Sequence, residues 1–449
     1  MSEWRKVKIG AFLHRYRQPV QLESDKDYAL VTIRTKHKGV VLREMKKGGQ
    51  IGSNMSRIKK GQFILSGIDA RHGAFGIVPD ELDGAIVTND FWCFDVDENI
   101  VKRDFFYWLT TTQLFLDACI KSSKGETQRV RLQKDAFYNF EFNFPPVEKQ
   151  AALLTHLQTI DTTLIALSNE QLQQKTYIAQ LRQSILQEAI EGKLTADWRA
   201  AHPVCAGDPN TDAAALLSVI QAEKRALIAS GKLKKEKPLA PITHDEMPFA
   251  LPEGWVWVQL ITACESVVDC HNKTATYQES GIPLVRTSSI RNMELNFDKS
   301  IRYVSEETYK FWSKRCPPQP GDILFTREAP MGEAAIIPEG KFVCMGQRIM
   351  LFRVGNKFLS EKYLLYAVQN PTAKKIINSV AVGSGVKHLR VGDVERLPIP
   401  LPPLAEQHAI VERVDRLLAS VSALEQQVAE RQAYARQLMQ AVLQEAFAG

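Results

Sequence analysis

The sequence PPVEKQAAL opens a stretch at Pro145 that ends in QLRQSILQEAIEG at Gly192, and PPLAEQHAI opens a second stretch at Pro402 that ends in QLMQAVLQEAFAG at Gly449. The two stretches align without a gap over 48 positions at a constant offset of 257 residues. A gap-free match of this length indicates a duplicated element. The chain is therefore predicted to be a two-fold object built from one polypeptide.

The duplication continues upstream more faintly. GQFILS from Gly61 corresponds to GDILFT from Gly321, and Phe106 corresponds to Tyr363, with offsets that drift from 260 to 257 residues. Small insertions and deletions in the loops of two diverged copies leave such a drift. Each half is therefore expected to be a globular domain followed by a long helix.

Both copies of the duplicated stretch repeat a seam position every three or four residues, most of them apolar, which is typical of a coiled coil. The Pro-Pro pairs are natural entry points, because proline tolerates the first helical turn and disfavours helix just before it. Each helix is expected to run about 60 Å and to pair with the other copy. The predicted seam is Leu157, Ile160, Leu164, Leu167, Gln171, Gln174, Ile178, Leu181 and Ile185 against Val414, Leu417, Val421, Leu424, Val428, Arg431, Ala435, Leu438 and Val442.

The globular parts mix short β-branched and aromatic runs with helical stretches, so the predicted class is α+β. Strands are expected at 28–33, 61–65, 86–96, 282–286, 322–326 and 347–354, and helices near 105–120 and 360–369. The predicted order is a first domain at 1–143, a first long helix at 144–193, a connector with a short helix (213–230) at 194–250, a second domain at 251–400 and a second long helix at 401–449.

Charge is unevenly placed along the chain. Residues 1–60 carry fifteen Lys/Arg against five Asp/Glu, whereas residues 61–120 carry three against ten. A basic stripe is typical of polyanion binding, although a solvated lysine-rich surface accounts for it equally well. Seven scattered cysteines, with no apolar run long enough to span a membrane, favour reduced thiols and a cytoplasmic location.

Catalytic motifs are missing from the sequence. It has no phosphate-binding G-x-x-x-x-G-K-[ST] loop, no H-E-x-x-H and no G-x-S-x-G. The segment Asn143–Val147 only approaches the Asn-Pro-Pro-aromatic motif that grips a flipped base, because Phe144 interrupts it. Cys264 and Cys270, beside His271, lack the second Cys pair of a zinc site. No catalytic, cofactor-binding or metal-binding residue is therefore expected.

The motifs, taken in order, resemble the specificity subunit of type I restriction-modification systems. The first domain departs most from the pattern of this family, because it has no clear counterpart to the second domain's LPEGW motif (Leu251–Trp255) beyond Glu3-Trp4. The motifs that carry the resemblance are FPPVEKQ (Phe144–Gln150), LRQSILQEAIEGKLT (Leu181–Thr195), LPEGW (Leu251–Trp255), GDILFTREAPMGEAAII (Gly321–Ile337) and LPPLAEQ (Leu401–Gln407).

The resemblance implies two target-recognition domains, separated by two antiparallel coiled-coil helices, that each read half of a bipartite site in double-stranded DNA. It further implies two methyltransferase subunits that use S-adenosylmethionine and, where one is present, a restriction subunit that uses ATP and Mg²⁺. The chain itself would be non-catalytic. The alternative is a coiled-coil adaptor whose two domains bind proteins. The polar seam positions Gln171, Gln174 and Arg431 would fix the register of the helices or dock a partner.

Basic residues in both domains are the candidates for DNA contact, either with base edges or with phosphates. They are Lys36, Lys38, Arg43, Lys46, Lys47, Arg57, Lys59, Lys60, Lys124, Arg129 and Arg131 in the first domain and Arg286, Arg291, Arg327, Lys387 and Arg390 in the second.

Overall fold

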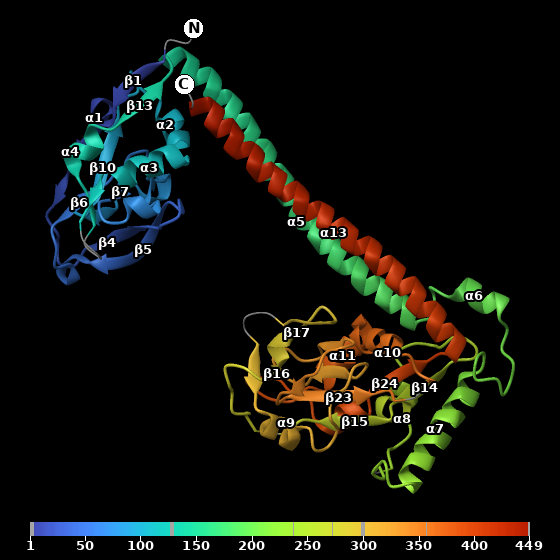
Figure 1. Ribbon diagram of the computed structural model, residues 1–449. Helices are drawn as coiled ribbons and strands as arrows, with labels where there is room; N and C mark the ends of the chain where they lie inside the picture. The colour runs from blue at the N-terminus through green and yellow to red at the C-terminus, as the bar shows by residue number, and fades with distance from the viewer. Residues whose placement is uncertain are drawn as a thin grey trace. The chain divides into compact units, whose positions relative to one another are not determined.

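The computed structural model describes residues 4–125, 130–236, 238–271, 273–297, 301–355 and 357–447. These residues belong to two compact units, unit 1 (residues 1–173 and 428–449) and unit 2 (residues 174–427). The long helices α5 (Val147–Ile190) and α13 (Leu404–Phe447) each contribute one end to each unit, as Figure 1 shows. Within each unit the two helix segments run antiparallel, because the start of one lies beside the end of the other.

Unit 1 contains a four-stranded sheet of order β2-β10-β7-β8, a five-stranded sheet of order β3-β6-β9-β4-β5 and the pairs β1-β13 and β11-β12. Its strands are β1 (Arg5–Lys8), β2 (Leu13–Tyr16), β3 (Pro19–Val20), β4 (Asp27–Ile33), β5 (Val40–Lys47), β6 (Met55–Arg57), β7 (Phe63–Ser66), β8 (Phe75–Ile77), β9 (Ile86–Thr88), β10 (Phe91–Val96), β11 (Ser123–Lys124), β12 (Arg131–Leu132) and β13 (Glu141–Phe144). Its shorter helices are α1 (Ile9–Phe12), α2 (Arg103–Thr110), α3 (Gln113–Lys121) and α4 (Lys134–Tyr138), with 3₁₀ turns at Gly48–Gln50, Ala70–His72 and Asp80–Leu82.

Unit 2 contains a four-stranded sheet of order β15-β23-β20-β21, a three-stranded sheet of order β19-β16-β22 and the pairs β14-β24 and β17-β18. Its strands are β14 (Val256–Gln259), β15 (Ser266–Asp269), β16 (Ile282–Val285), β17 (Ile290–Arg291), β18 (Glu294–Leu295), β19 (Arg302–Val304), β20 (Ile323–Thr326), β21 (Ala334–Ile336), β22 (Cys344–Met345), β23 (Ile349–Arg353) and β24 (Pro398–Leu401). Its shorter helices are α6 (Ala196–Ala201), α7 (Ala213–Ala229), α8 (Leu260–Ala263), α9 (Glu306–Trp312), α10 (Glu361–Gln369), α11 (Pro371–Val380) and α12 (Val391–Glu395), with 3₁₀ turns at His244–Glu246 and Thr287–Ser289.

The four-stranded sheets are the shared framework of the two copies, because their strand orders correspond one to one. The match reaches the first strand of each domain. Ile9 N donates to Phe140 O at 2.9 Å, and Leu260 N donates to Leu397 O at the same distance. The offset of 251 residues between Ile9 and Leu260 pairs Trp4 with Trp255, so it agrees with the partial counterpart of LPEGW noted at Glu3-Trp4.

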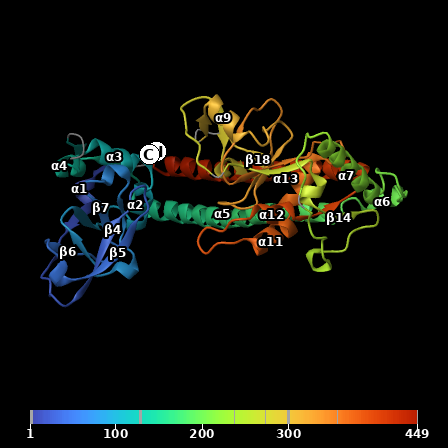
Figure 2. The same ribbon diagram turned by 90° about the horizontal axis from the view of Figure 1, so that it is seen from below.

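The two copies diverge between the first and second strands, in chain order, of this framework. Unit 1 inserts strands β3 to β6 between β2 and β7, whereas unit 2 inserts β16 to β19 and helix α9 between β15 and β20. Figure 1 shows β4 and β5 at the end of unit 1 away from the start of α5, and Figure 2 shows α9 and β18 on the opposite side of unit 2 from α11. A constant sheet thus carries a different module in each domain.

Aromatic rings fill the main core of unit 1. Phe63 packs edge-on against Phe106, with ring centroids 4.9 Å apart, and both side chains are fully buried. The end of α13 closes this core, since the ring of Phe447 lies 4.8 Å from that of Phe105. Burying a Phe side chain contributes about 1.5–3 kcal/mol. The C-terminal turns of α13 are therefore an integral part of the first domain.

A buried glutamine explains the PPxxxQ motif in both copies. Gln150 accepts a hydrogen bond from Lys102 N at 2.8 Å and donates to Ile100 O and Pro145 O. Gln407 accepts from Ser360 N at 2.9 Å and also donates to Pro402 O. Both glutamines are fully buried. Gln150 thus links the start of α5 to the start of α2, and Gln407 links the start of α13 to the start of α10.

The predicted single helix near 105–120 is two helices, α2 and α3, because three consecutive threonines end the first one. The hydroxyl groups of Thr110, Thr111 and Thr112 donate to the carbonyl oxygens three residues earlier at 2.6, 2.7 and 2.7 Å. Such local bonds compete with helix continuation. The predicted strand at 86–96 is likewise divided into β9 and β10, with a turn at Asn89–Asp90.

The predicted seam is wrong in its phase along α13. Val414, Val421 and Val428 are buried, but Leu417, Leu424 and Leu438 are 37%, 46% and 56% exposed. Leu418 and Met439 pack against the cores instead, and each lies one residue after the predicted position, Leu417 or Leu438. The contact stripe therefore follows a 4-3 rather than a 3-4 spacing. On α5, Leu157, Gln171 and Ile185 are buried as predicted, whereas Leu181 is 44% exposed and Arg431 of α13 is also exposed.

The connector is anchored to unit 2 through Glu406, which is 1% exposed. Its carboxylate accepts hydrogen bonds from Thr195 Oγ1 at 2.6 Å and Trp255 Nε1 at 2.7 Å and forms an ion pair with Arg199. Gly192 must be glycine here, since its φ is +70° and a Cβ would lie 2.7 Å from the Arg199 guanidinium. The GKLT and LPEGW motifs thus meet at one buried carboxylate.

Candidate nucleic-acid interface

The basic candidates of the first domain fall into groups on different elements. Lys36 and Lys38 lie in the turn between β4 and β5, and Arg43, Lys46 and Lys47 lie on β5. Arg57 ends β6 and is followed by Lys59 and Lys60. Lys124 and Arg131 are direct cross-strand partners on β11 and β12. Arg129 is outside the described residues.

Some of these side chains are already engaged within the domain. Arg57 donates from Nη1 to Gly84 O at 3.2 Å, and the ammonium group of Lys59 lies 4.9 Å from the ring centroid of Tyr16. Lys60 lies 3.7 Å from an oxygen of Asp80 in a solvent-exposed pair. Exposed pairs of this kind contribute at most about 1 kcal/mol, so they leave the lysine available to a phosphate.

Four candidates of the second domain gather around the segment Gly346–Arg348. Arg286 lines a cavity of about 170 Å³ with Gln347 and Arg348, and Arg327 lines a cavity of about 330 Å³ with Arg348 and His388. Lys387 and Arg390 flank this second cavity along the chain. The fifth candidate, Arg291, is directed to its own backbone, where Nη1 donates to Thr287 O at 2.8 Å.

Sequence reasoning missed Arg348, which lies at the centre of this group. It is one of the few residues other than glycine with positive φ, at +67°, and its side chain is 48% exposed. Its Nε lies 3.0 Å from Oε2 of Glu328, whose side chain is 18% exposed. The available signal was positional: Arg348 directly precedes β23, as Asp90 directly precedes β10 in the other copy.

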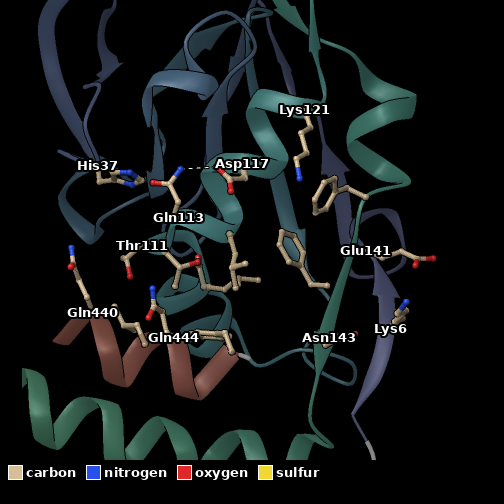
Figure 3. A pocket seen from close by; sticks show the side chains of 17 residues that line it. Lys6, His37, Thr111, Gln113, Asp117, Lys121, Glu141, Asn143, Gln440 and Gln444 are labelled. Carbon is tan, nitrogen blue, oxygen red and sulfur yellow. Dashed lines mark hydrogen bonds between the residues drawn. The ribbon is translucent and has the colours of Figure 1, made fainter. Parts of the chain in front are cut away.

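A groove lies in unit 1 where the last turns of α13 meet the start of α3. Its volume is about 930 Å³, and Gln440, Gln444 and Leu114 are among the lining residues. Figure 3 shows Gln440 and Gln444 projecting from α13 on the side of Thr111, with Gln113 bonded to Asp117 above them. The lining mixes amide groups with apolar side chains and contains no recognisable catalytic arrangement.

Unit 2 has a groove at the repeat-related position. Its volume is about 730 Å³, and it is lined by Gln183, Gln187 and Pro371, each 257 residues before or after a residue of the first groove. The Oε1 of Gln187 accepts hydrogen bonds from both N and Oγ1 of Thr372, at 3.1 and 3.0 Å. Two equivalent grooves are thus built independently in the two units.

Exposed apolar side chains also recur at repeat-related positions of the long helices. Tyr177 and Leu181 on α5 are 65% and 44% exposed, and Tyr434 and Leu438 on α13 are 68% and 56% exposed. Each pair is spaced i, i+4 and so lies on one face of its helix. Both copies therefore carry an exposed apolar pair at the same repeat-related position of the long helix.

The cysteines do not form a metal site in the described part of the chain, where no group of three potential ligands comes together. Burial raises the pKa of Cys264 and of Cys270 to about 12, so both remain protonated thiols at neutral pH. Across the described residues, every helix is too short or too polar to cross a membrane.

The two units share one α+β framework, and each unit carries a different module on its four-stranded sheet. This architecture defines a protein with two related but unlike domains. The sequence matches the model of the type I restriction modification DNA specificity domain over residues 1–175 and 253–431, and the chain belongs to this family. The role of such specificity subunits is non-catalytic.

Individual relatives agree with this family. The chain is 25% identical over 375 residues to the EcoAI specificity subunit of Escherichia coli, covering 73% of this chain and 61% of that protein. It is 31% identical over 261 residues to the Escherichia coli EcoEI specificity subunit, covering 56% of this chain and 41% of that protein. The chain thus spans less than two thirds of the length of these two relatives.

Solved structures share the fold. The HsdS subunit from Thermoanaerobacter tengcongensis matches with a TM-score of 0.55 and 19% identity, covering 99% of this chain and 97% of that chain. A chain from a structural study of complex assembly and conformational transition of the type I R-M system matches with a TM-score of 0.64, at the same identity and coverage. The α+β class and the duplicated arrangement predicted from the sequence are therefore confirmed.

Proposed function

We propose that this chain is the DNA-specificity subunit of a type I restriction-modification complex, in which each domain reads one half of a bipartite DNA site. The observation that carries the proposal is the pairing of a constant four-stranded sheet with a different module in each copy. Two half-sites of different sequence require such an arrangement, whereas a symmetric site would be read by two identical domains.

The proposal includes two methyltransferase subunits as partners, one for each half of the chain. The equivalent grooves and the equivalent exposed pairs, Tyr177 with Leu181 and Tyr434 with Leu438, support this stoichiometry, because one partner surface would fit both. Methylation inside a duplex requires the target base to be flipped out, so a methyltransferase is needed beside each recognition domain.

The chemistry in this proposal resides in the partners. S-adenosylmethionine would bind to the methyltransferase subunits, and ATP with Mg²⁺ would bind to a restriction subunit where one is present. The chain would act in the cytoplasm, together with the DNA, and would contribute binding and positioning only.

Native mass spectrometry of the chain co-expressed with its methyltransferase tests the stoichiometry. The expected complex contains two methyltransferase subunits per chain. The double variant Tyr434→Ser and Leu438→Ser should lose one of the two, and exchange of the exposed Tyr107 for Ser should lose neither. A wild-type complex that remains one to one under saturating partner contradicts the symmetric proposal.

Gel shifts across a range of salt concentrations separate DNA recognition from the adaptor alternative. Binding that neutralises phosphates weakens steeply as salt rises, because condensed counterions are released. An apolar protein interface lacks this dependence. Absence of DNA binding by the complex at low salt would leave only the adaptor function.

A further inference from the structure

Three loops of the second domain are joined by backbone hydrogen bonds into what we call the loop frame. Arg327 N, at the end of β20, donates to Arg348 O at 2.8 Å, and Leu389 N donates to Arg327 O at 3.0 Å. Val382 and His388 form an antiparallel bridge beside it. The frame therefore fixes the backbone of Arg348 directly before β23.

The first domain builds the same loop frame. Gly67 N donates to Asp90 O at 2.8 Å, and Leu132 N donates to Gly67 O at 2.8 Å. Lys124 and Arg131 pair across antiparallel strands, in place of the bridge between residues 382 and 388. These residues correspond to those of the second frame at offsets of 260, 258 and 257, which are the offsets of the duplication. The backbone arrangement is conserved although none of the frame side chains is, apart from a leucine.

Each loop frame presents one exposed arginine held by a carboxylate, but the two arginines come from different loops. In the second domain Arg348 is paired with Glu328 at 3.0 Å. In the first domain the exposed arginine is Arg131, at the position that corresponds to His388. Its Nη1 lies 3.1 Å from Oδ1 of Asp90, and Asp90 is at the position that corresponds to Arg348. The side chain of Arg131 is 61% exposed. The same scaffold thus displays the same functional group in two different positions.

This arrangement suits recognition of a base edge better than contact with a phosphate. A guanidinium fork can donate two parallel hydrogen bonds to O6 and N7 of guanine, but only when its plane is correctly oriented. A carboxylate partner restricts the rotamers of the arginine before DNA arrives and so lowers the entropy lost on binding. A phosphate can also be bound by the point charge of a lysine, so it depends less on the orientation of the side chain. Arg327 is less suited to this role, because it is half-buried and its Nη1 donates to Leu389 O at 3.2 Å within the frame.

We infer that Arg131 and Arg348 are the base-reading residues of the first and second domains, each recognising a guanine in its own half of the DNA site. Asp90 and Glu328 are positioning residues that orient them. This inference rests on the proposed function, since it assigns residues to the DNA-reading role of the two domains.

Selection from a random-sequence duplex library by the full chain, in complex with its co-expressed methyltransferase, tests the inference. Wild-type protein should select a motif of two blocks. Arg348→Ala should lose one guanine preference in one block and bind the wild-type motif about ten- to a hundredfold more weakly, with unchanged binding to scrambled duplex. Arg131→Ala should do the same to the other block. Arg396→Ala removes a comparably exposed arginine that pairs with Glu246 at 3.3 Å and should leave both blocks intact.

Arg348→Lys separates base reading from a phosphate contact, because lysine keeps the charge and loses the fork. The lysine variant should resemble the alanine variant, and Glu328→Gln should weaken the same guanine preference to a smaller extent. A lysine variant that selects the wild-type motif with wild-type affinity overturns the inference. Failure of the wild-type complex to select any motif would instead count against the proposed function, and thermal unfolding of each variant shows whether its domain is folded.

Discussion

Removing the carboxylate of Glu406 should destabilise unit 2 and leave unit 1 intact. Glu406→Ala leaves the Trp255 N–H and the Thr195 hydroxyl without their acceptor and leaves Arg199 without its counter-ion. Breaking a buried ion pair by removing one partner costs about 3–5 kcal/mol. The Arg199 side chain is 21% exposed, so water relieves part of this cost, and we expect about 3 kcal/mol. Glu406→Gln keeps an acceptor and should cost about half as much.

Urea unfolding followed by tryptophan fluorescence measures the change in free energy, and hydrogen exchange locates it. Protection should fall around Thr195 and Trp255 and stay unchanged in unit 1. Lys149 occupies the repeat-related position but is exposed, so Lys149→Ala should change stability by no more than about 0.5 kcal/mol. A Glu406→Ala variant that loses less than about 1 kcal/mol, or that loses protection equally in both units, would refute the reasoning.

Three further results are expected. Gln407→Ala should cost about 2 kcal/mol of unfolding free energy in denaturant titrations, because Ser360 N loses its buried partner; a cost near zero would contradict the bridging role. A thiol reagent at neutral pH should modify Cys205, the one exposed cysteine among the residues that the structure describes, and spare Cys264, whose burial raises its pKa to about 12. Reaction of several thiols before unfolding would contradict this. Neutralising four first-domain lysines together should weaken binding to all DNA sequences alike and should lower the slope of log affinity against log salt by up to about four units. The four are Lys46, Lys47, Lys59 and Lys60. An unchanged slope would place these lysines away from DNA.

The duplication allowed the fold class and the repeated arrangement to be predicted from the sequence. It did not allow the buried positions of the helix seam to be predicted. Leucines such as Leu417 and Leu424 satisfy a heptad pattern as well as the buried positions do, because apolar character alone does not distinguish a buried face from one kept for a partner. The break between α2 and α3 depends on threonine hydroxyls that bond locally, which periodicity does not reveal.

Charge was a weaker guide to the proposed base-reading residues than backbone geometry. The basic stripe led to lysines scattered over several strands, whereas Arg348 stands in a sequence, Gly346-Gln347-Arg348, with no unusual charge. The role proposed for Arg348 rests on hydrogen bonds between residues apart in the chain, such as the bond from Arg327 N to Arg348 O. Such a frame becomes visible only when the two copies are compared in three dimensions.

The most direct test of the central claim is the DNA motif methylated in cells that express this chain with its methyltransferase, read by modification-sensitive sequencing of the whole genome. Two recognition domains of different sequence predict a motif of two unlike blocks separated by a fixed number of unspecified base pairs. One continuous block, or methylation that persists unchanged when this chain is absent, would contradict the claim that the two domains read two halves of one site.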